Sequence, residues 1–526
     1  MFLIISGEEK NMKLRFYIAL IIAKISIPAL KITGHNATDF PGRVALKLCP
    51  EFLKYVAKPK KIIAVTGTNG KTSTANLTID MLKRFGVVTL NNSRGSNINS
   101  GISSALLNGV NIFNKEKYET AVLEMDERSA ARLFPYVKPD YMIVTNLSRD
   151  SIMRNAHPEY IRWLLEKYVP ETTKLVLNAD DLMSCYMLPN NDRVYFGIEK
   201  LPTDTVKCHN LIDDLQICPK CDHKLKYEYR RYSNVGRAHC VNCDFGSPDY
   251  DYSAGNVDFE NMRFTFRGPD FEVDLPIIDD RFVNLYNETA LITLLLQLGY
   301  SMDEIKKNLD TVEVVKTRFN HETIGDIKVF NVLGKGLNAF AESRVYETIV
   351  SQPGDKELVM FINDLGLAAH WSENISWIYD TDFETLNVDS IKKIVAVGDR
   401  GLDYRLRMLF AGIPEEKIVH VMKMDDAIKQ VDIKPGMNYY VLYGADPGSF
   451  AVGNKQAKEL ARIVREKMGS KQAAAAEAAA GEAAAGEAVA EEAVAEVTAP
   501  EAEEAAPEAV SAEGVATEEQ GEEVKA

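Results

Sequence analysis

The stretch IIAVTGTNGKT, residues 62–72, decides the fold of this chain. Its first four residues are an apolar run that predicts a short buried strand, and a helical pattern follows from Thr72 to Phe85 and ends at Gly86. A strand, a glycine-rich turn and a helix in this order bring backbone N–H groups and a helix N-terminus together, where they bind an anion. We therefore expect a nucleotide phosphate site.

The side chains of this loop fit phosphate chemistry. We expect Lys71 to reach the β- and γ-phosphates of ATP and the Thr72 hydroxyl to ligate Mg²⁺. The longer P-loop pattern requires a glycine where Val65 stands, so this chain carries the shorter form GTNGKT. The predicted ATP-binding residues of the loop are Gly67, Thr68, Asn69, Gly70, Lys71 and Thr72.

Further short apolar runs alternate with helix-length segments and predict an α/β fold with a parallel sheet. The runs of the first domain lie at residues 120–124, 141–145 and 174–177, and helical patterns at 285–298 and 301–309 close that domain. A second α/β domain is indicated by runs at residues 358–362, 391–397, 418–421 and 439–443.

Carboxylates follow the run at residues 120–124. Glu124, Asp126 and Glu127 are expected at the carboxyl edge of the sheet, where ligands bind in open α/β folds. One of them can hold a second metal, and we assign Glu124 as a magnesium ligand beside Thr72. The alternative is a solvated cluster at the end of a strand, because acidic side chains are ordinarily exposed.

Four cysteines form two CxxC pairs, Cys218 with Cys221 and Cys240 with Cys243, eighteen residues apart. This spacing matches a four-thiolate zinc ribbon, in which the four ligands leave no open position for water, so we predict a structural metal. A redox pair and a nucleic-acid-binding ribbon are the alternatives.

The charge of the chain is uneven. The 526 residues carry a net charge of −15, but residues 470–526 hold fifteen Glu against two Lys, which leaves −2 on the rest. A strongly basic nucleic-acid surface is therefore not expected. The Ala/Glu-rich tail from residue 469 predicts disorder, and seven cysteines in so long a chain argue against a secreted disulfide scaffold.

The N-terminal apolar stretch, residues 16–30, is interrupted by Lys24 and is shorter than the roughly twenty residues that span a bilayer. No small-residue cleavage site follows it, which disfavours a signal peptide, and Met12 is an alternative start. We expect a helix that packs on the body, with an amphipathic helix at a membrane surface as the alternative.

The GTNGKT loop resembles the ATP site of the Mur ligase family, whose members join amino acids to peptidoglycan precursors through an acyl-phosphate. Other segments are similar to the branch of that family that forms the ligase subunit of lipid II isoglutaminyl synthase. This resemblance covers about residues 12–465. It rests on MKLRF at 12–16, NATDFPG at 36–42, the four-cysteine insertion, Asn363-Asp364 and SWIYD at 376–380. The chain departs from the pattern at SEN, residues 372–374, and at VLG, residues 332–334.

The resemblance implies a set of domain boundaries. These are an N-terminal helical segment (1–60), a Mur ligase central ATP-binding domain (61–314) with the zinc ribbon inserted at about 205–255, a Rossmann-like α/β C-terminal domain (315–468) and a disordered acidic tail (469–526).

The resemblance also implies an activity, which is ATP-dependent amidation of the D-glutamate α-carboxylate of the lipid II stem peptide to D-isoglutamine. ATP, Mg²⁺ and structural Zn²⁺ are the implied cofactors, and a GatD-type glutaminase in a heterodimer supplies ammonia. Asn287 and Arg318 fall where the family contacts nucleotide, and Asp364 matches an acidic residue that orients or deprotonates ammonia. The implied location is cytoplasmic, or peripheral at the inner face of the membrane that carries lipid II.

Two alternatives stay open. One is a Mur-like or folylpolyglutamate-like ligase that adds an amino acid to a related peptide acceptor instead of ammonia. The other is a non-enzymatic zinc-ribbon protein with a degenerate nucleotide site, against which the intact Lys71 and Thr72 weigh.

Overall fold

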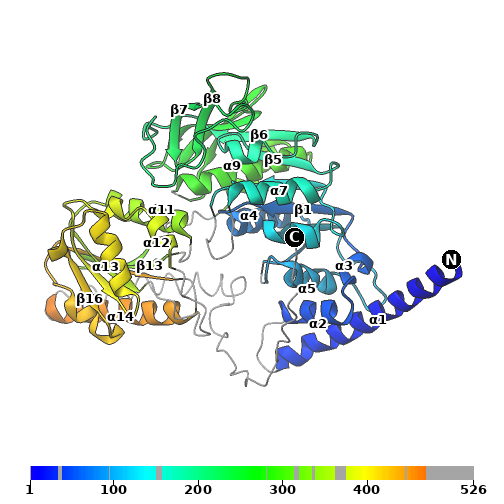
Figure 1. Cartoon of the computed structure of the whole chain (residues 1–526), viewed down its shortest axis with the longest axis horizontal. Coiled ribbons are helices and arrows are strands. Elements are labelled where there is room, and N and C mark those ends of the chain that lie inside the picture. Colours follow the sequence, from blue (N-terminus) through cyan, green and yellow to red (C-terminus); the bar gives the residue numbers. More distant parts are fainter. Residues whose placement is uncertain are drawn as a thin grey trace, which may run out of the picture.

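In the computed structural model, the chain forms two large β-sheets covered by helices, a small β-hairpin and a long N-terminal helix (Figure 1). Within the described ranges, no helix is both long and apolar enough to cross a lipid bilayer. The structure describes residues 2–32, 38–93, 95–149, 157–279, 281–312, 319–334, 338–361, 375–444 and 447–468.

The larger sheet has nine strands in the order β11-β10-β9-β6-β5-β4-β1-β3-β2. All neighbouring pairs from β2 to β9 are parallel, and β10 and β11 add an antiparallel edge. The strands are β1 (Lys61–Thr66), β2 (Thr89–Asn91), β3 (Thr120–Glu124), β4 (Tyr141–Val144), β5 (Lys174–Asn178), β6 (Arg193–Ile198), β9 (Tyr252–Asp258), β10 (Arg263–Gly268) and β11 (Phe271–Pro276).

Alternate side chains of β1 enter two different cores, because successive residues of a strand point to opposite faces. Ile62 and Ala64 pack in the core that includes residues of α1, α2, α5 and α7. Ile63 and Val65 pack in the core that includes residues of α4 and α9. These helices are α1 (Phe2–Ile32), α2 (Phe40–Leu48), α4 (Lys71–Arg84), α5 (Asn99–Gly109), α7 (Pro158–Tyr168) and α9 (Phe282–Gln297). The short α3 (Phe52–Tyr55), α6 (Ala130–Leu133), α8 (Leu182–Cys185) and α10 (Met302–Leu309) complete this part.

The second sheet has six strands in the order β12-β13-β17-β14-β15-β16, and all pairs except β12 with β13 are parallel. One face packs on α11, α12 and α13, and the other packs on α14. The elements are β12 (Phe319–Ile324), β13 (Ile327–Leu333), β14 (Lys356–Phe361), β15 (Ile391–Val397), β16 (Ile418–Val421), β17 (Asn438–Tyr443), α11 (Ala339–Ser351), α12 (Trp377–Asp380), α13 (Gly401–Phe410) and α14 (Pro447–Met468).

The cysteine-bearing hairpin interrupts the larger sheet between β6 and β9. It consists of β7 (Leu225–Tyr232) and β8 (Val235–Cys240), which pair antiparallel at the top of Figure 1. The nine-stranded sheet resumes at Tyr252, which lies inside the range of about 205–255 expected for the insertion. The acidic tail lies outside the described residues.

Candidate functional site

The loop between β1 and α4 turns at two glycines. Gly67 and Gly70 have φ of 124° and 86°, in the left-handed region that favours glycine. Neither position has room for a side chain. A Cβ on Gly67 would lie 2.2 Å from Thr145 Oγ1, and one on Gly70 would lie 2.5 Å from Asn287 Oδ1. The loop therefore follows a path that requires glycine, and α4 starts directly after it.

The segment that leaves β4 braces this loop from the neighbouring strand. The backbone N–H groups of Thr68 and Asn69 donate to the backbone oxygen and the Oδ1 of Asn146, at 2.8 and 3.2 Å. The Asn69 carbonyl accepts from Thr145 Oγ1 at 2.6 Å, and the Thr68 hydroxyl exchanges hydrogen bonds with the Ser148 backbone. The loop is thus fixed before any ligand binds.

Lys71, the first residue of α4, folds its side chain back over the loop. Its Nζ donates to the Gly67 carbonyl and lies 3.1 and 3.3 Å from the two carboxylate oxygens of Glu127. Burial raises the pKa of Glu127, and the charge of Lys71 opposes that rise. The pair places the Lys71 ammonium group beside the glycine turn, where a phosphate group of a nucleotide would accept hydrogen bonds from it.

The two predicted magnesium ligands lie on either side of this turn. Thr72 is exposed at the start of α4. Glu124 ends β3, in register with Val65, and its Oε1 accepts a hydrogen bond from Asn97 at 2.8 Å. Carboxylate and hydroxyl oxygens are ligands that suit Mg²⁺. Asp126 is engaged elsewhere, in an ion pair with Arg128.

Of the three remaining predicted site residues, the structure describes one. Asn287, on α9, is buried directly against Gly70, and its Nδ2 donates to Asn284 Oδ1 at 3.1 Å. Arg318 and Asp364 lie outside the described residues, so their roles stay predictions.

The second sheet contributes groups that reach the phosphate loop. Asn338 caps α11 and its Nδ2 lies 3.5 Å from Asn69 Oδ1. Arg149, which follows the β4 exit, donates to Asp214 of the insertion and to Asp380 of α12. One guanidinium thus joins the nucleotide-side strand, the insertion and the C-terminal part of the chain.

The segment that leads into the hairpin makes a second contact with the C-terminal part. The Leu211 N–H and Asn210 Nδ2 donate to the two carboxylate oxygens of Asp382, at 2.5 and 2.8 Å. Burial raises the pKa of Asp382, and these donors oppose the rise. The Arg344 guanidinium also stacks over Phe282, 4.2 Å from the ring centroid. Both the insertion and α9 therefore contact the part of the chain that carries the second sheet.

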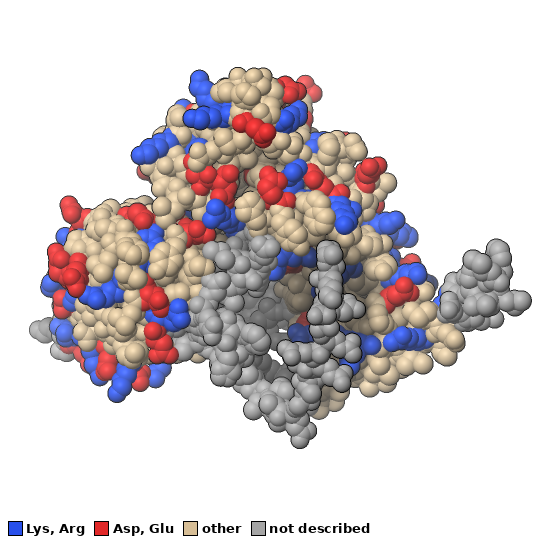
Figure 2. Space-filling view, viewed as in Figure 1, with Lys and Arg blue, Asp and Glu red and all other residues tan. Residues whose placement is uncertain are grey.

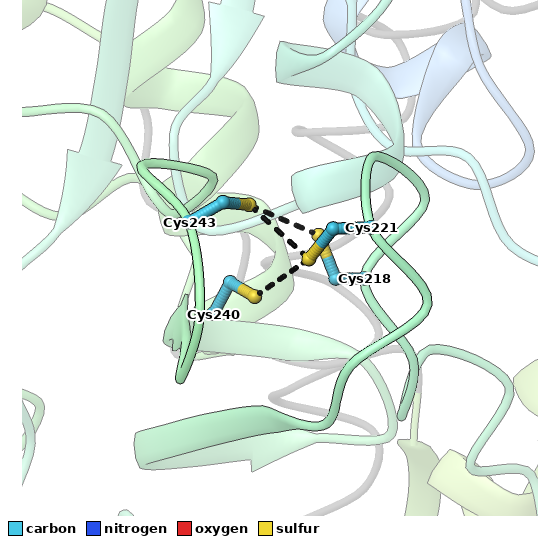
Figure 3. Close-up of side chains that lie close together, drawn as sticks. All are labelled: Cys218, Cys221, Cys240 and Cys243. Atoms are coloured by element: carbon cyan, nitrogen blue, oxygen red, sulfur yellow. Dashed lines mark hydrogen bonds between the residues drawn. The ribbon is translucent and has the colours of Figure 1, made fainter.

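The four predicted zinc ligands converge at the end of the hairpin (Figure 3). Their Sγ atoms lie within 4.8 Å of one another, with contacts of 3.4 to 3.6 Å between members of the two CxxC pairs. Thiolates around one tetrahedral zinc at about 2.3 Å would be about 3.8 Å apart, so the arrangement fits this metal closely. The backbone N–H of His223 lowers the pKa of Cys221 to about 6, whereas burial raises the pKa of Cys218.

Sequence reasoning missed the partner of Lys71 and the contacts of Arg149. Glu127 was predicted as one of three edge carboxylates, with Glu124 chosen as the functional one. No spacing rule indicates that Asp214 and Asp380 meet at Arg149, because the three residues come from separate elements. A usable signal was the position of residues 145–149 directly after a strand of the parallel core.

The fold and the loop define a class of protein, an ATP-dependent ligase of the Mur type. A family model described as the Mur ligase middle domain matches residues 65–219, and a model described as the MurT ligase C-terminal domain matches residues 338–445. The chain belongs to the MurT branch of the Mur ligase family. This confirms the resemblance on which the prediction of family and fold depended.

Two bacterial proteins are similar in sequence over most of the chain. The MurT subunit of lipid II isoglutaminyl synthase of Streptococcus pneumoniae is 30% identical over 438 residues, which are 82% of this chain and 95% of that protein. The MurT subunit of Staphylococcus aureus (strain COL) is 29% identical over 427 residues, which are 80% and 94%. A pseudomurein peptide ligase type C from Methanothermus fervidus shares the fold, with a TM-score of 0.55, 22% identity and coverage of 80% and 81%.

A first prediction concerns the cysteine cluster. Protein purified without chelator should contain about one Zn²⁺ per chain, and Cys240→Ser should lower both the metal content and the melting temperature. Cys208→Ser, outside the cluster, is the matched control and should keep the metal. Metal analysis and thermal unfolding measure both effects, and wild-type protein without zinc would contradict the prediction.

Proposed function

We propose that this chain amidates the D-glutamate α-carboxylate of the lipid II stem peptide, with ATP, as the ligase subunit of a lipid II isoglutaminyl synthase. The observation that carries the proposal is the intact phosphate loop, with Lys71 at its turn, in a chain similar to MurT subunits over nearly their whole length. Peptidoglycan synthesis is the process to which such an amidation belongs.

The chemistry explains why a phosphate site is required. A carboxylate is a poor electrophile, so one of its oxygens first attacks the γ-phosphorus of ATP, which gives an acyl-phosphate and ADP. Ammonia then attacks the acyl carbon, the bond between that carbon and the phosphate oxygen breaks, and the departing phosphate takes one proton from the nitrogen as the amide forms. Lys71 neutralises charge on the phosphoryl group during the first step.

Within this proposal the other site residues take defined roles. The backbone of residues 67–70 cradles the phosphates, and Asn287 contacts the nucleotide next to Gly70. Thr72 and Glu124 hold Mg²⁺, which when bound lowers the charge repulsion between phosphate oxygens. Arg318 adds a nucleotide contact, and Asp364 orients or deprotonates ammonia. The four cysteines hold a structural Zn²⁺.

The proposal includes a glutaminase partner of the GatD type. Free ammonia is scarce near neutral pH, and a docked glutaminase delivers it at high effective concentration before the acyl-phosphate hydrolyses. An exposed apolar row on α13 supports a docking surface in the C-terminal domain. Leu402, Leu406 and Phe410 are 56, 45 and 68% exposed at helical spacing, and the Tyr379 ring lies beside Phe410, with 6.5 Å between the ring centroids.

The location follows from the substrate. Lipid II is membrane-bound, and ATP and glutamine are cytoplasmic, so we place the protein in the cytoplasm, peripheral at the inner face of the membrane.

The second candidate function is a ligase that adds an amino acid to a related peptide acceptor. The structural likeness to a pseudomurein peptide ligase favours it, because the same phosphate site serves either nucleophile.

The phosphate site is tested by Lys71→Ala. We expect substrate-dependent ADP release to fall by at least about a hundredfold, because the cation at the transferring phosphoryl group is lost. Lys83→Ala, on the exposed face of the same helix, is the matched control and should keep full activity. Unchanged ADP release in Lys71→Ala, with zinc still present, would remove the loop from the reaction.

The mass of the product decides between the two candidate functions. With lipid II, ATP and high ammonium chloride, the product should be about 1 Da lighter than the substrate, as expected when NH₂ replaces OH. A gain equal to an amino-acid residue, with ammonia inert, would establish the second candidate.

The partner surface is tested by the double substitution Leu406→Glu and Phe410→Glu. Glutamine-dependent amidation should be lost because the glutaminase no longer docks, whereas amidation with ammonium chloride should continue. Gel filtration of the mixed subunits measures the association directly. If the variant still forms the heterodimer, the α13 row is not the interface.

A further inference from the structure

The N-terminal helix α1 is apolar on two opposite faces. Its inner face packs into the body through Phe16, Ala19, Leu20 and Ala23, all 2% exposed or less. Its outer face is exposed and equally apolar. Of twenty-four exposed large apolar side chains in the described residues, seven lie on this helix: Leu14, Tyr17, Ile18, Ile21, Ile22, Ile25 and Ile32.

The exposed residues of α1 form one continuous face. Leu14, Ile18, Ile21 and Ile25 follow the spacing of one side of a helix, and Ile25 is 63% exposed. A row of large aliphatic side chains facing water is unfavourable unless something covers it. Because the inner face is fixed against α2, α3 and α5, the helix can offer its outer half without leaving the body.

The part of the chain that carries this outer face is rich in positive charge. Residues 11–61 hold ten Lys and Arg against two Asp and Glu, in a chain whose residues 1–469 have a net charge of −2. Lys13 and Arg15 are exposed on α1 at positions that flank the apolar row. Arg43 of α2 is 70% exposed and pairs with Asp39. Figure 2 shows tan surface along α1 at the lower right, with blue atoms beside it.

We propose that the outer face of α1 docks on an anionic phospholipid bilayer, with the helix lying in the plane of the interface. Aliphatic side chains enter the boundary between headgroups and acyl chains, and the flanking cations contact lipid phosphates. A second copy of this chain would cover the apolar row, but it would bring the same excess of cations against this face. The buried inner face also prevents α1 from crossing the bilayer.

Docking in this way has a consequence for the nucleotide site. The segment after α1 contacts the start of α5 through Asp39 and Ser100, and the turn before α5 carries Asn97, which bonds Glu124. A short series of hydrogen bonds therefore connects the segment after α1 with the edge of the site that carries Glu124. On the proposed function, this brings the site toward a lipid-linked substrate.

The test uses the full chain and vesicles without lipid II, so its result does not depend on the amidation. Wild-type protein should float with vesicles of phosphatidylcholine and phosphatidylglycerol, and should bind less to phosphatidylcholine alone or at high salt. Ile21→Glu with Ile25→Glu should weaken binding at least about tenfold, because both side chains lose their burial in lipid. Leu406→Glu with Phe410→Glu, equally exposed but on α13, should bind as wild type.

Circular dichroism and nucleotide binding check that the variants are folded. Failure of wild-type protein to bind vesicles overturns the proposal, as does a double α1 variant that binds normally. Sedimentation that shows a wild-type dimer, lost in the α1 variant, together with absent vesicle binding, would assign the face to a second copy instead. None of these outcomes changes the expected product mass, so the two proposals fail separately.

Discussion

The whole site depends on a close approach of backbone at two positions. Gly67 and Gly70 admit Thr145 and Asn287 at distances that any Cβ would forbid. That contact lets the β4 exit brace the loop and lets α9 lie against it. With the turn fixed, Lys71 can fold over the loop and pair with Glu127, a buried carboxylate whose desolvation that ion pair offsets in part.

The hairpin insertion is a structural support as well as the carrier of the four-cysteine cluster. It branches from the larger sheet and carries the four clustered cysteines. Its Asn210 bonds Asp382 of the C-terminal part, and its Asp214 bonds Arg149, which also bonds Asp380. Arg149 lies at the centre of these contacts, one residue after Ser148 and three after Asn146, which bond Thr68 and Asn69 of the loop. The insertion, the C-terminal part and the segment that braces the phosphate loop are therefore linked through a few short hydrogen bonds. Loss of the metal would loosen the insertion and with it the docking of the second sheet.

The two exposed apolar rows, on α1 and on α13, lie on different parts of the chain. The row on α13 belongs to the C-terminal part, where a second subunit would supply ammonia, and the row on α1 lies on the helices that cover the larger sheet. A membrane-bound acceptor and a soluble nitrogen donor would thus reach the site from different elements. Such an arrangement keeps the two macromolecular contacts from competing for the same surface.

The sequence by itself determined the local features. Apolar runs predicted β3, β15 and β16 with their observed bounds, and the two CxxC pairs and the GTNGKT loop predicted the two kinds of site, because these signals depend on neighbouring residues. The tertiary structure alone decided that Glu127 pairs with Lys71, that Arg149 meets Asp214 and Asp380, and that α1 exposes a second apolar face. Contacts between distant segments depend on how sheets and helices pack in space, and burial of one helix face depends on which elements cover it, so neither is contained in local spacing.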